Sequence, residues 1–255
     1  MVNGSAEHKK STLSQQADPT MFGQGMTFAA KEAYKLLRTN LLFSLPELVE
    51  GKCYVIGITS SLRDEGKSTT AIHLASTLAE QGERVLVIDG DLRLPSLHKK
   101  LSIALKPGLS NLLVTRRITD QFFQKINVGR RNELQITFDV LSAGDIPPNP
   151  SELIGSGRMK QRLEQLSQDY DFILLDLPPV TAVTDALVAS KLVDGFIMVV
   201  RNEYTDSGSL KEAMRQLNLV DAKVLGFVYT HARTTSIGYR KKYKYRYYSH
   251  YEDKR

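Results

Sequence analysis

The amino-acid sequence predicts one α/β domain with a mostly parallel central sheet and helices on both faces. Short apolar runs alternate along the chain with segments whose apolar residues have helical spacing. The runs are apolar throughout, which is typical of parallel strands that are buried on both faces. A chain of 255 residues with 42% hydrophobic residues is long enough for one large core and short for two full domains.

Each apolar run is predicted to be a strand, and the segments between them supply the helices. The expected strands cover residues 54–59, 85–89, 135–141, 172–176, 195–200 and 224–229. An amphipathic helix is expected to begin after Thr27, which suits an N-cap position, and to end near Ser44. Further helices are expected at 67–80, 151–168, 184–192 and 207–217. Residues 142–150 contain three prolines, which favours a loop.

The composition changes at both ends of the predicted domain. Residues 1–26 are polar and are expected to form a flexible arm, residues 27–232 the globular domain, and residues 233–255 a flexible tail. The sequence contains no apolar run of about 18 to 20 residues, the length that a membrane-spanning helix needs. The first thirty residues also have no apolar signal-peptide region. We therefore expect a soluble, cytoplasmic protein.

The segment after the first predicted strand has the pattern of a phosphate-binding loop. It begins at Ser60, ends in Gly66-Lys67-Ser68-Thr69-Thr70, and leads directly into a predicted helix. Backbone N–H groups at such a helix start bind phosphates, and the helix dipole favours their negative charge. Lys67 would contact the β and γ phosphates of ATP, and the Ser68 hydroxyl would bind Mg²⁺. The remaining loop residues expected at the nucleotide are Ser61, Asp64, Glu65, Gly66 and Thr69, with Ser61 standing where the usual pattern has glycine.

Acidic residues end two further predicted strands. Asp89 and Asp91, followed by Arg93, end the second strand, and Asp176 ends the fourth. Because ligands of open α/β sheets bind beyond the carboxyl ends of the strands, these residues should meet the phosphate loop in one crevice. Together they predict a P-loop NTPase fold that binds ATP and Mg²⁺.

Each of these polar residues has an expected role in the crevice. Asp89 and Asp176 are expected to hold Mg²⁺ together with Ser68, mostly through water. Asp89 or Asp91 would accept the proton of the attacking hydroxyl, and Arg93 would contact the nucleotide. For Asp91 and Arg93, a loop cap or an ion pair is the structural alternative.

Several stretches in a fixed order resemble the bacterial tyrosine kinase family of capsule and exopolysaccharide synthesis. They are residues 32–40, the phosphate loop, 89–95, 141–144, 147–153, 176–179 and 184–186, and the resemblance covers about residues 28–255. It implies ATP-dependent autophosphorylation of a C-terminal tyrosine cluster between neighbouring subunits of a ring. It also implies an oligomerisation motif, here Glu32, Lys35 and Arg38, in which lysine replaces the family's first arginine. In the phosphate loop, Arg63-Asp64 replaces the family's usual Pro-Gly.

The predicted tail carries most of the tyrosines and all of the net charge. The six tyrosines that the family resemblance implies as phosphorylation sites are Tyr239, Tyr243, Tyr245, Tyr247, Tyr248 and Tyr251. Residues 233–255 hold eight basic and two acidic side chains, so the tail accounts for the formal charge of +6 and the rest of the chain is neutral. Interleaved tyrosines and basic residues also suit nucleic acid or an anionic membrane. The neutral body argues against nucleic acid as the main partner.

The resemblance further implies several partners: a membrane-bound activator of the polysaccharide co-polymerase type, a cognate tyrosine phosphatase, and protein substrates in polysaccharide synthesis. The activator would hold the protein at the inner face of the cell membrane. One alternative is a P-loop ATPase of the partition and division-positioning class, whose loop usually carries a lysine where this chain has Leu62. Another is a module that binds nucleotide without turnover.

Overall fold

The computed structural model describes residues 26–45, 51–132 and 134–232. The arm predicted over residues 1–26, except for residue 26, lies outside the described residues, as does the whole predicted tail, 233–255.

Seven strands form one central sheet in the described part of the chain. They are β1 (Tyr54–Ser60), β2 (Val85–Asp89), β3 (Gln124–Arg131), β4 (Leu134–Leu141), β5 (Phe172–Asp176), β6 (Gly195–Arg201) and β7 (Val224–Thr230). Their order across the sheet is β3-β4-β2-β5-β1-β6-β7. All neighbouring strands run parallel except β3 and β4, which form an antiparallel hairpin. The expected mostly parallel sheet is therefore confirmed.

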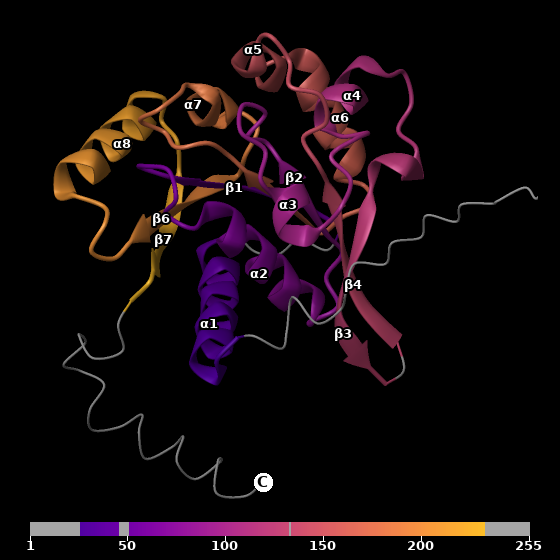
Figure 1. Cartoon of the computed structure of the whole chain (residues 1–255), viewed down its shortest axis with the longest axis horizontal. Helices are drawn as coiled ribbons and strands as arrows, with labels where there is room; N and C mark the ends of the chain where they lie inside the picture. Colours follow the sequence, from indigo (N-terminus) through magenta and orange to yellow (C-terminus); the bar gives the residue numbers. More distant parts are fainter. Residues whose placement is uncertain (1–25, 46–50, 133, 233–255) are drawn as a thin grey trace, which may run out of the picture.

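Helices cover both faces of this sheet, as Figure 1 shows. The helices are α1 (Phe28–Ser44), α2 (Lys67–Ala79), α3 (Leu97–Leu101), α4 (Leu109–Val114), η2 (Asp120–Phe122), α5 (Pro150–Ile154), α6 (Gly157–Leu166), α7 (Asp185–Ala189) and α8 (Ser207–Leu219). One buried cluster joins α4, α5, α6, α7 and α8 to the sheet. A second cluster joins α1, α2 and α3 to the opposite face. None of the helices among the described residues is long and apolar enough to cross a membrane.

The six predicted strands are confirmed within one residue at either end, but the edge strand β3 was missed. β3 is mostly polar and partly exposed, so it lacks the continuous apolar run that marks the central strands. The short helices α3, α4 and η2 were also missed. Each has only three to six residues, too few to show a helical period.

The single helix predicted over residues 151–168 is wrong, because the chain forms α5 and α6 instead. The Ser156 hydroxyl accepts a hydrogen bond of 3.1 Å from the Met159 N–H and caps the start of α6. Gly155 lies between the two helices, where an added Cβ would come within 2.5 Å of the Val188 side chain. Gly155, the residue after α5, thus lets α5 lie against α7.

Helix α1 begins as predicted, with the Thr27 hydroxyl accepting from the Ala30 N–H at 3.3 Å. Its Arg38 guanidinium donates to the Thr77 carbonyl of α2 at 2.7 Å. Lys35 forms an exposed intrahelical ion pair of 2.8 Å with Glu32. Arg38 therefore also fastens α1 to the helix that follows the phosphate loop.

Candidate functional site

The loop between β1 and α2 has the local geometry of a phosphate cradle. Gly66 caps α2 with φ 99°, a left-handed conformation that glycine adopts without strain. An added Cβ at this position would come within 3.2 Å of the Thr230 methyl group. Asp64 is also left-handed, with φ 57°, at a position where the family pattern has glycine. Lys67, Ser68 and Thr69 form the first turn of α2, so their N–H groups lie at its positive end.

Glu65 holds this loop in shape from within. Its side chain is fully buried, and its carboxylate accepts the Leu62 N–H at 2.7 Å. The same carboxylate accepts the hydroxyl of Thr205, which lies in the loop between β6 and α8. Glu65 was expected to contact the nucleotide, whereas both of these bonds lie within the protein. The Glu65 carboxylate therefore links the start of the phosphate loop, at Leu62, to the loop between β6 and α8.

The ends of β6 and β7 brace the same loop through its backbone. The Thr230 hydroxyl donates to the Glu65 carbonyl at 2.7 Å. The Arg201 guanidinium donates to the Asp64 carbonyl at 3.0 Å. These two contacts satisfy carbonyl groups at the turn and fix its backbone. We therefore regard the loop as pre-shaped before any nucleotide binds.

Asp89 and Asp176 lie side by side beneath this loop. The pairing of β2 with β5 sets the two residues opposite each other at the carboxyl ends of the strands. Both are almost completely buried. One Asp89 oxygen accepts the Ser96 and Leu97 N–H groups at 3.2 and 3.1 Å. The other Asp89 oxygen and Asp176 Oδ1 have no hydrogen-bond partner among the described residues.

The burial of these charged groups moves their pKa values strongly. Burial raises the pKa of Asp89, and the neighbouring Asp176 raises it further. Burial also raises the pKa of Asp176, against the lowering effect of the Ser68 hydroxyl and the Lys67 ammonium group. Burial lowers the pKa of Lys67, although Asp176 and Asp91 oppose that shift. Each group is thus short of compensating charge, which is typical of a site that binds charged ligands.

The donor set fits a magnesium ion that arrives with a nucleotide. Buried carboxylate oxygens without partners are hard ligands of the kind that Mg²⁺ prefers, and the Ser68 hydroxyl adds another. No group of three or more His, Cys, Asp or Glu side chains in the described part of the chain is arranged to hold a metal ion. Mg²⁺ usually keeps several waters and takes phosphate oxygens as ligands, so two carboxylates and a hydroxyl are enough.

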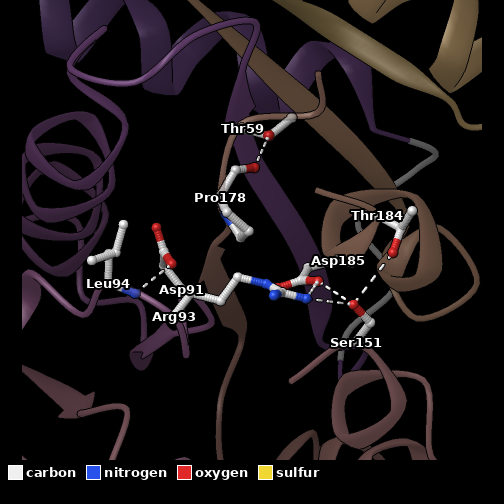
Figure 2. A network of polar contacts seen from close by, with 8 residues as sticks. All are labelled: Thr59, Asp91, Arg93, Leu94, Ser151, Pro178, Thr184 and Asp185. Carbon is white, nitrogen blue, oxygen red and sulfur yellow. Dashed lines mark hydrogen bonds and ion pairs between the residues drawn. The ribbon is translucent and has the colours of Figure 1, made fainter. Parts of the chain in front are cut away.

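Two of the predicted site residues make contacts of the kind given as the structural alternative. The Asp91 carboxylate accepts the Leu94 N–H at 3.0 Å and so caps its own loop. The Arg93 guanidinium forms an ion pair of 3.1 Å with Asp185 (Figure 2). Asp91 remains half-buried at the carboxyl end of β2, next to the carboxylate pair. Arg93, in this arrangement, is engaged away from the phosphate loop.

The sequence did not reveal three residues that the structure places at the site. The Ser96 hydroxyl lies 2.8 Å from the Ser68 hydroxyl. Thr205 binds Glu65, and Asp185 binds Arg93. Asp185 lies in the Thr-Asp-Ala stretch that carried part of the family resemblance, but its partner is 92 positions away in the chain. The six tail tyrosines lie outside the described residues, and Glu32, Lys35 and Arg38 lie on α1.

Comparison with known proteins gives one consistent result. A family model described as an AAA domain matches residues 55–225. Tyrosine-protein kinase YwqD of Bacillus subtilis is 35% identical over 197 residues, which cover 77% of this chain and 79% of that protein. Putative tyrosine-protein kinase CapB of Staphylococcus aureus is 34% identical over 220 residues, covering 86% and 90%. The solved kinase domain of Escherichia coli tyrosine kinase ETK is 31% identical, with a TM-score of 0.69 and coverage of 80% of this chain and 78% of that one.

The bond between Thr205 and Glu65 can be tested by a change that keeps the size of the side chain. Thr205→Val removes the hydroxyl and leaves the buried carboxylate one donor short, at a cost of about 1–3 kcal/mol. Because this bond fixes the loop that would bind the phosphates, we expect Mg-ADP binding to weaken about tenfold, or by about 1.4 kcal/mol, in calorimetric titration. Thr115→Val, which removes the hydroxyl bond from the residue after α4 to the Leu112 carbonyl, is the control. Equal affinity in both variants would contradict the bracing role.

The raised pKa of Asp176 predicts how stability changes with pH. Its folded-state pKa lies above the ordinary value of about 3.9, so its ionisation destabilises the folded protein as pH rises past that value. Asp176→Asn should therefore raise the Tm of the nucleotide-free protein at pH 8, with a gain that shrinks toward pH 4. Asp171→Asn should act in the opposite direction, because the Arg84 guanidinium lowers the pKa of Asp171. Thermal melts between pH 4 and pH 8 check both, and a lower Tm for Asp176→Asn at pH 8 would refute the prediction.

Proposed function

Because this chain belongs to the bacterial tyrosine kinase family, we propose that it transfers the γ-phosphoryl group of ATP to tyrosine hydroxyls of its own C-terminal tail. The protein is a protein-tyrosine kinase with a nucleotide-binding P-loop fold. The observation that carries the proposed mechanism is the meeting of three strand ends. The phosphate loop, Asp89 and Asp176 come together at the carboxyl edge of β1, β2 and β5.

The residues at this edge have different roles in phosphoryl transfer. Lys67 and the N–H groups at the start of α2 bind the phosphates. Ser68, Asp89 and Asp176 would hold Mg²⁺, which would neutralise charge on the phosphate oxygens. Asp91 accepts the proton as the tyrosine oxygen bonds to the γ-phosphorus and the bond to the β–γ bridging oxygen breaks. Asp91 suits this role better than Asp89, since it is half-buried while Asp89 is enclosed and already accepts two N–H groups.

The acceptor tyrosines belong to the tail of a neighbouring copy in a ring. Glu32, Lys35 and Arg38 on α1 contribute to the contact between copies, as the family pattern implies. A membrane-bound activator holds the kinase at the inner face of the membrane, and a tyrosine phosphatase reverses the modification. Through its tail and other protein substrates, the kinase regulates capsule or exopolysaccharide synthesis and export. The relatives CapB and EpsB, both named as putative tyrosine-protein kinases, support the proposal.

The kinase activity is tested by incubating the full chain with Mg-ATP and mapping phosphotyrosine by mass spectrometry. We expect phosphate on the tyrosines between Tyr239 and Tyr251. Lys67→Met removes the buried ammonium group at the phosphates and should reduce the rate by more than about a hundredfold. Lys191→Met, at an exposed position after α7, should have no effect. ATP hydrolysis without phosphotyrosine would instead favour a P-loop ATPase of the partition class.

The assembly role of α1 makes a separate prediction. Arg38→Ala should leave Mg-ADP affinity within about twofold but reduce particle size in light scattering and slow autophosphorylation. Because Arg38 also binds the Thr77 carbonyl, a melting curve must show that the variant is folded. Lys31→Ala, which removes an exposed basic residue from the same helix, is the matched control. An unchanged particle size for folded Arg38→Ala would exclude this role.

A further inference from the structure

Asp185 is a buried carboxylate that the mechanism above does not use. It is the first residue of α7, and its side chain is fully buried. A carboxylate in such a place destabilises the fold unless it has charged or hydrogen-bonding partners. Its partners therefore indicate why the position is acidic.

Three donors from two other segments satisfy Asp185, as Figure 2 shows. Arg93 Nε and Nη2 donate to the two carboxylate oxygens, each at 3.1 Å, in a bidentate ion pair. The Ser151 hydroxyl donates to Asp185 Oδ1 at 2.5 Å. Arg93 Nη2 also donates to Ser151 Oγ at 2.9 Å. Two guanidinium nitrogens of Arg93 are thus held in a planar, bidentate arrangement. A lysine has a single ammonium group and could not reproduce it.

The network joins three segments that follow different strands of the sheet. Arg93 lies in the loop after β2, Ser151 in α5 after β4, and Asp185 in α7 after β5. The α5–α7 side of the network is closely packed, because Gly155 lies so near Val188 that an added Cβ would clash. The loop after β2 is therefore fastened to a closely packed support.

The fastened loop is the one that carries Asp91. Arg93 is only two residues further along, and the intervening turn is closed by the bond from the Leu94 N–H to the Asp91 carboxylate. In Figure 2 the Arg93 side chain extends from this loop toward Asp185 and Ser151. Releasing Arg93 would detach the part of this loop beside Asp91 from α5 and α7, while Ser96 and Leu97 would still donate to Asp89. The contacts of Glu65 in the phosphate loop involve other residues.

We propose that Asp185 is a positioning residue for phosphoryl transfer, which acts by holding Arg93 and thereby the loop that presents Asp91. The inference rests on the proposed function, in which Asp91 accepts the tyrosine proton. Phosphoryl transfer depends mainly on positioning, and a displacement of about 1 Å at a reacting group can slow an enzyme about a hundredfold. Loss of the network should therefore lower kcat and leave the KM for ATP nearly unchanged.

The same two strands supply a matched ion pair at their opposite ends. Arg84 precedes β2 and forms a bidentate pair with Asp171, which precedes β5. The chemistry and the supporting strands are the same as for Arg93 and Asp185, but this pair lies at the amino ends, away from the phosphate loop. If both ion pairs served only to stabilise the sheet, breaking either one would change kcat to the same extent.

The experiment measures kcat and KM of the full chain with Mg-ATP and a synthetic acceptor peptide with the sequence of residues 236–255. The variants are Asp185→Asn, Arg93→Gln, the double variant, and the control Asp171→Asn. Since 39% of the Arg93 side chain is exposed, Arg93→Gln provides a folded variant even if Asp185→Asn fails to fold. Titration with Mg-ADP and a melting curve accompany each kinetic measurement.

We expect Asp185→Asn and Arg93→Gln each to lower kcat at least about tenfold, with Mg-ADP affinity and the KM for ATP changed less than about threefold. The double variant should be no worse than either single variant, because the two residues act as one unit. Asp171→Asn should keep its kcat. Normal kcat in folded Arg93→Gln, or equal losses of kcat in all variants, would overturn the inference alone. Absence of phosphotyrosine with the unchanged chain would overturn the proposed function and the inference with it.

Discussion

The parallel pairing of β2 with β5 places two buried carboxylates next to each other at one edge of the sheet. Burial raises the pKa of both carboxyl groups, and a neighbouring carboxylate raises each pKa further: Asp176 acts on Asp89, and Asp91 acts on Asp176. Lys67 compensates only in part, because burial disfavours its own charge. The nucleotide-free fold therefore contains a local electrostatic strain, which the proposed Mg²⁺ would relieve.

Neutral hydroxyl groups hold the surrounding loops in place together with the charged side chains of Glu65 and Arg201. Thr59 donates to the Pro178 carbonyl, Thr181 to the Ser61 carbonyl, and Thr230 to the Glu65 carbonyl. A hydroxyl satisfies a backbone acceptor without adding net charge beside the phosphates. These bonds fix the backbone of the loop before a nucleotide arrives, which is the preorganisation that electrostatic catalysis needs.

The central part of this architecture was predictable because burial on both faces leaves an unmistakable apolar run. The strands that carry Asp89 and Asp176 were located from the sequence for that reason. The edge strand β3 was not located from the sequence, since its residues are mostly polar and partly exposed and so form no continuous apolar run. The partners of Arg93 and Glu65 were equally inaccessible, because Asp185 and Thr205 are 92 and 140 positions away from them and only the folded topology brings them together.

The charge of the tail would favour its binding before phosphorylation and its release afterwards. The tail begins with a net charge of +6, which suits an approach to a site that contains several carboxylates. Each phosphorylated tyrosine adds about −1.5 to −2 charges, so three or four modifications cancel the tail's positive charge. In the proposed cycle, the modified tail would then meet repulsion from Asp89, Asp91 and Asp176, and an unmodified tail would replace it more readily. The neutral body contributes little to either step, which leaves the phosphorylation state of the tail as the main electrostatic variable of the proposed cycle.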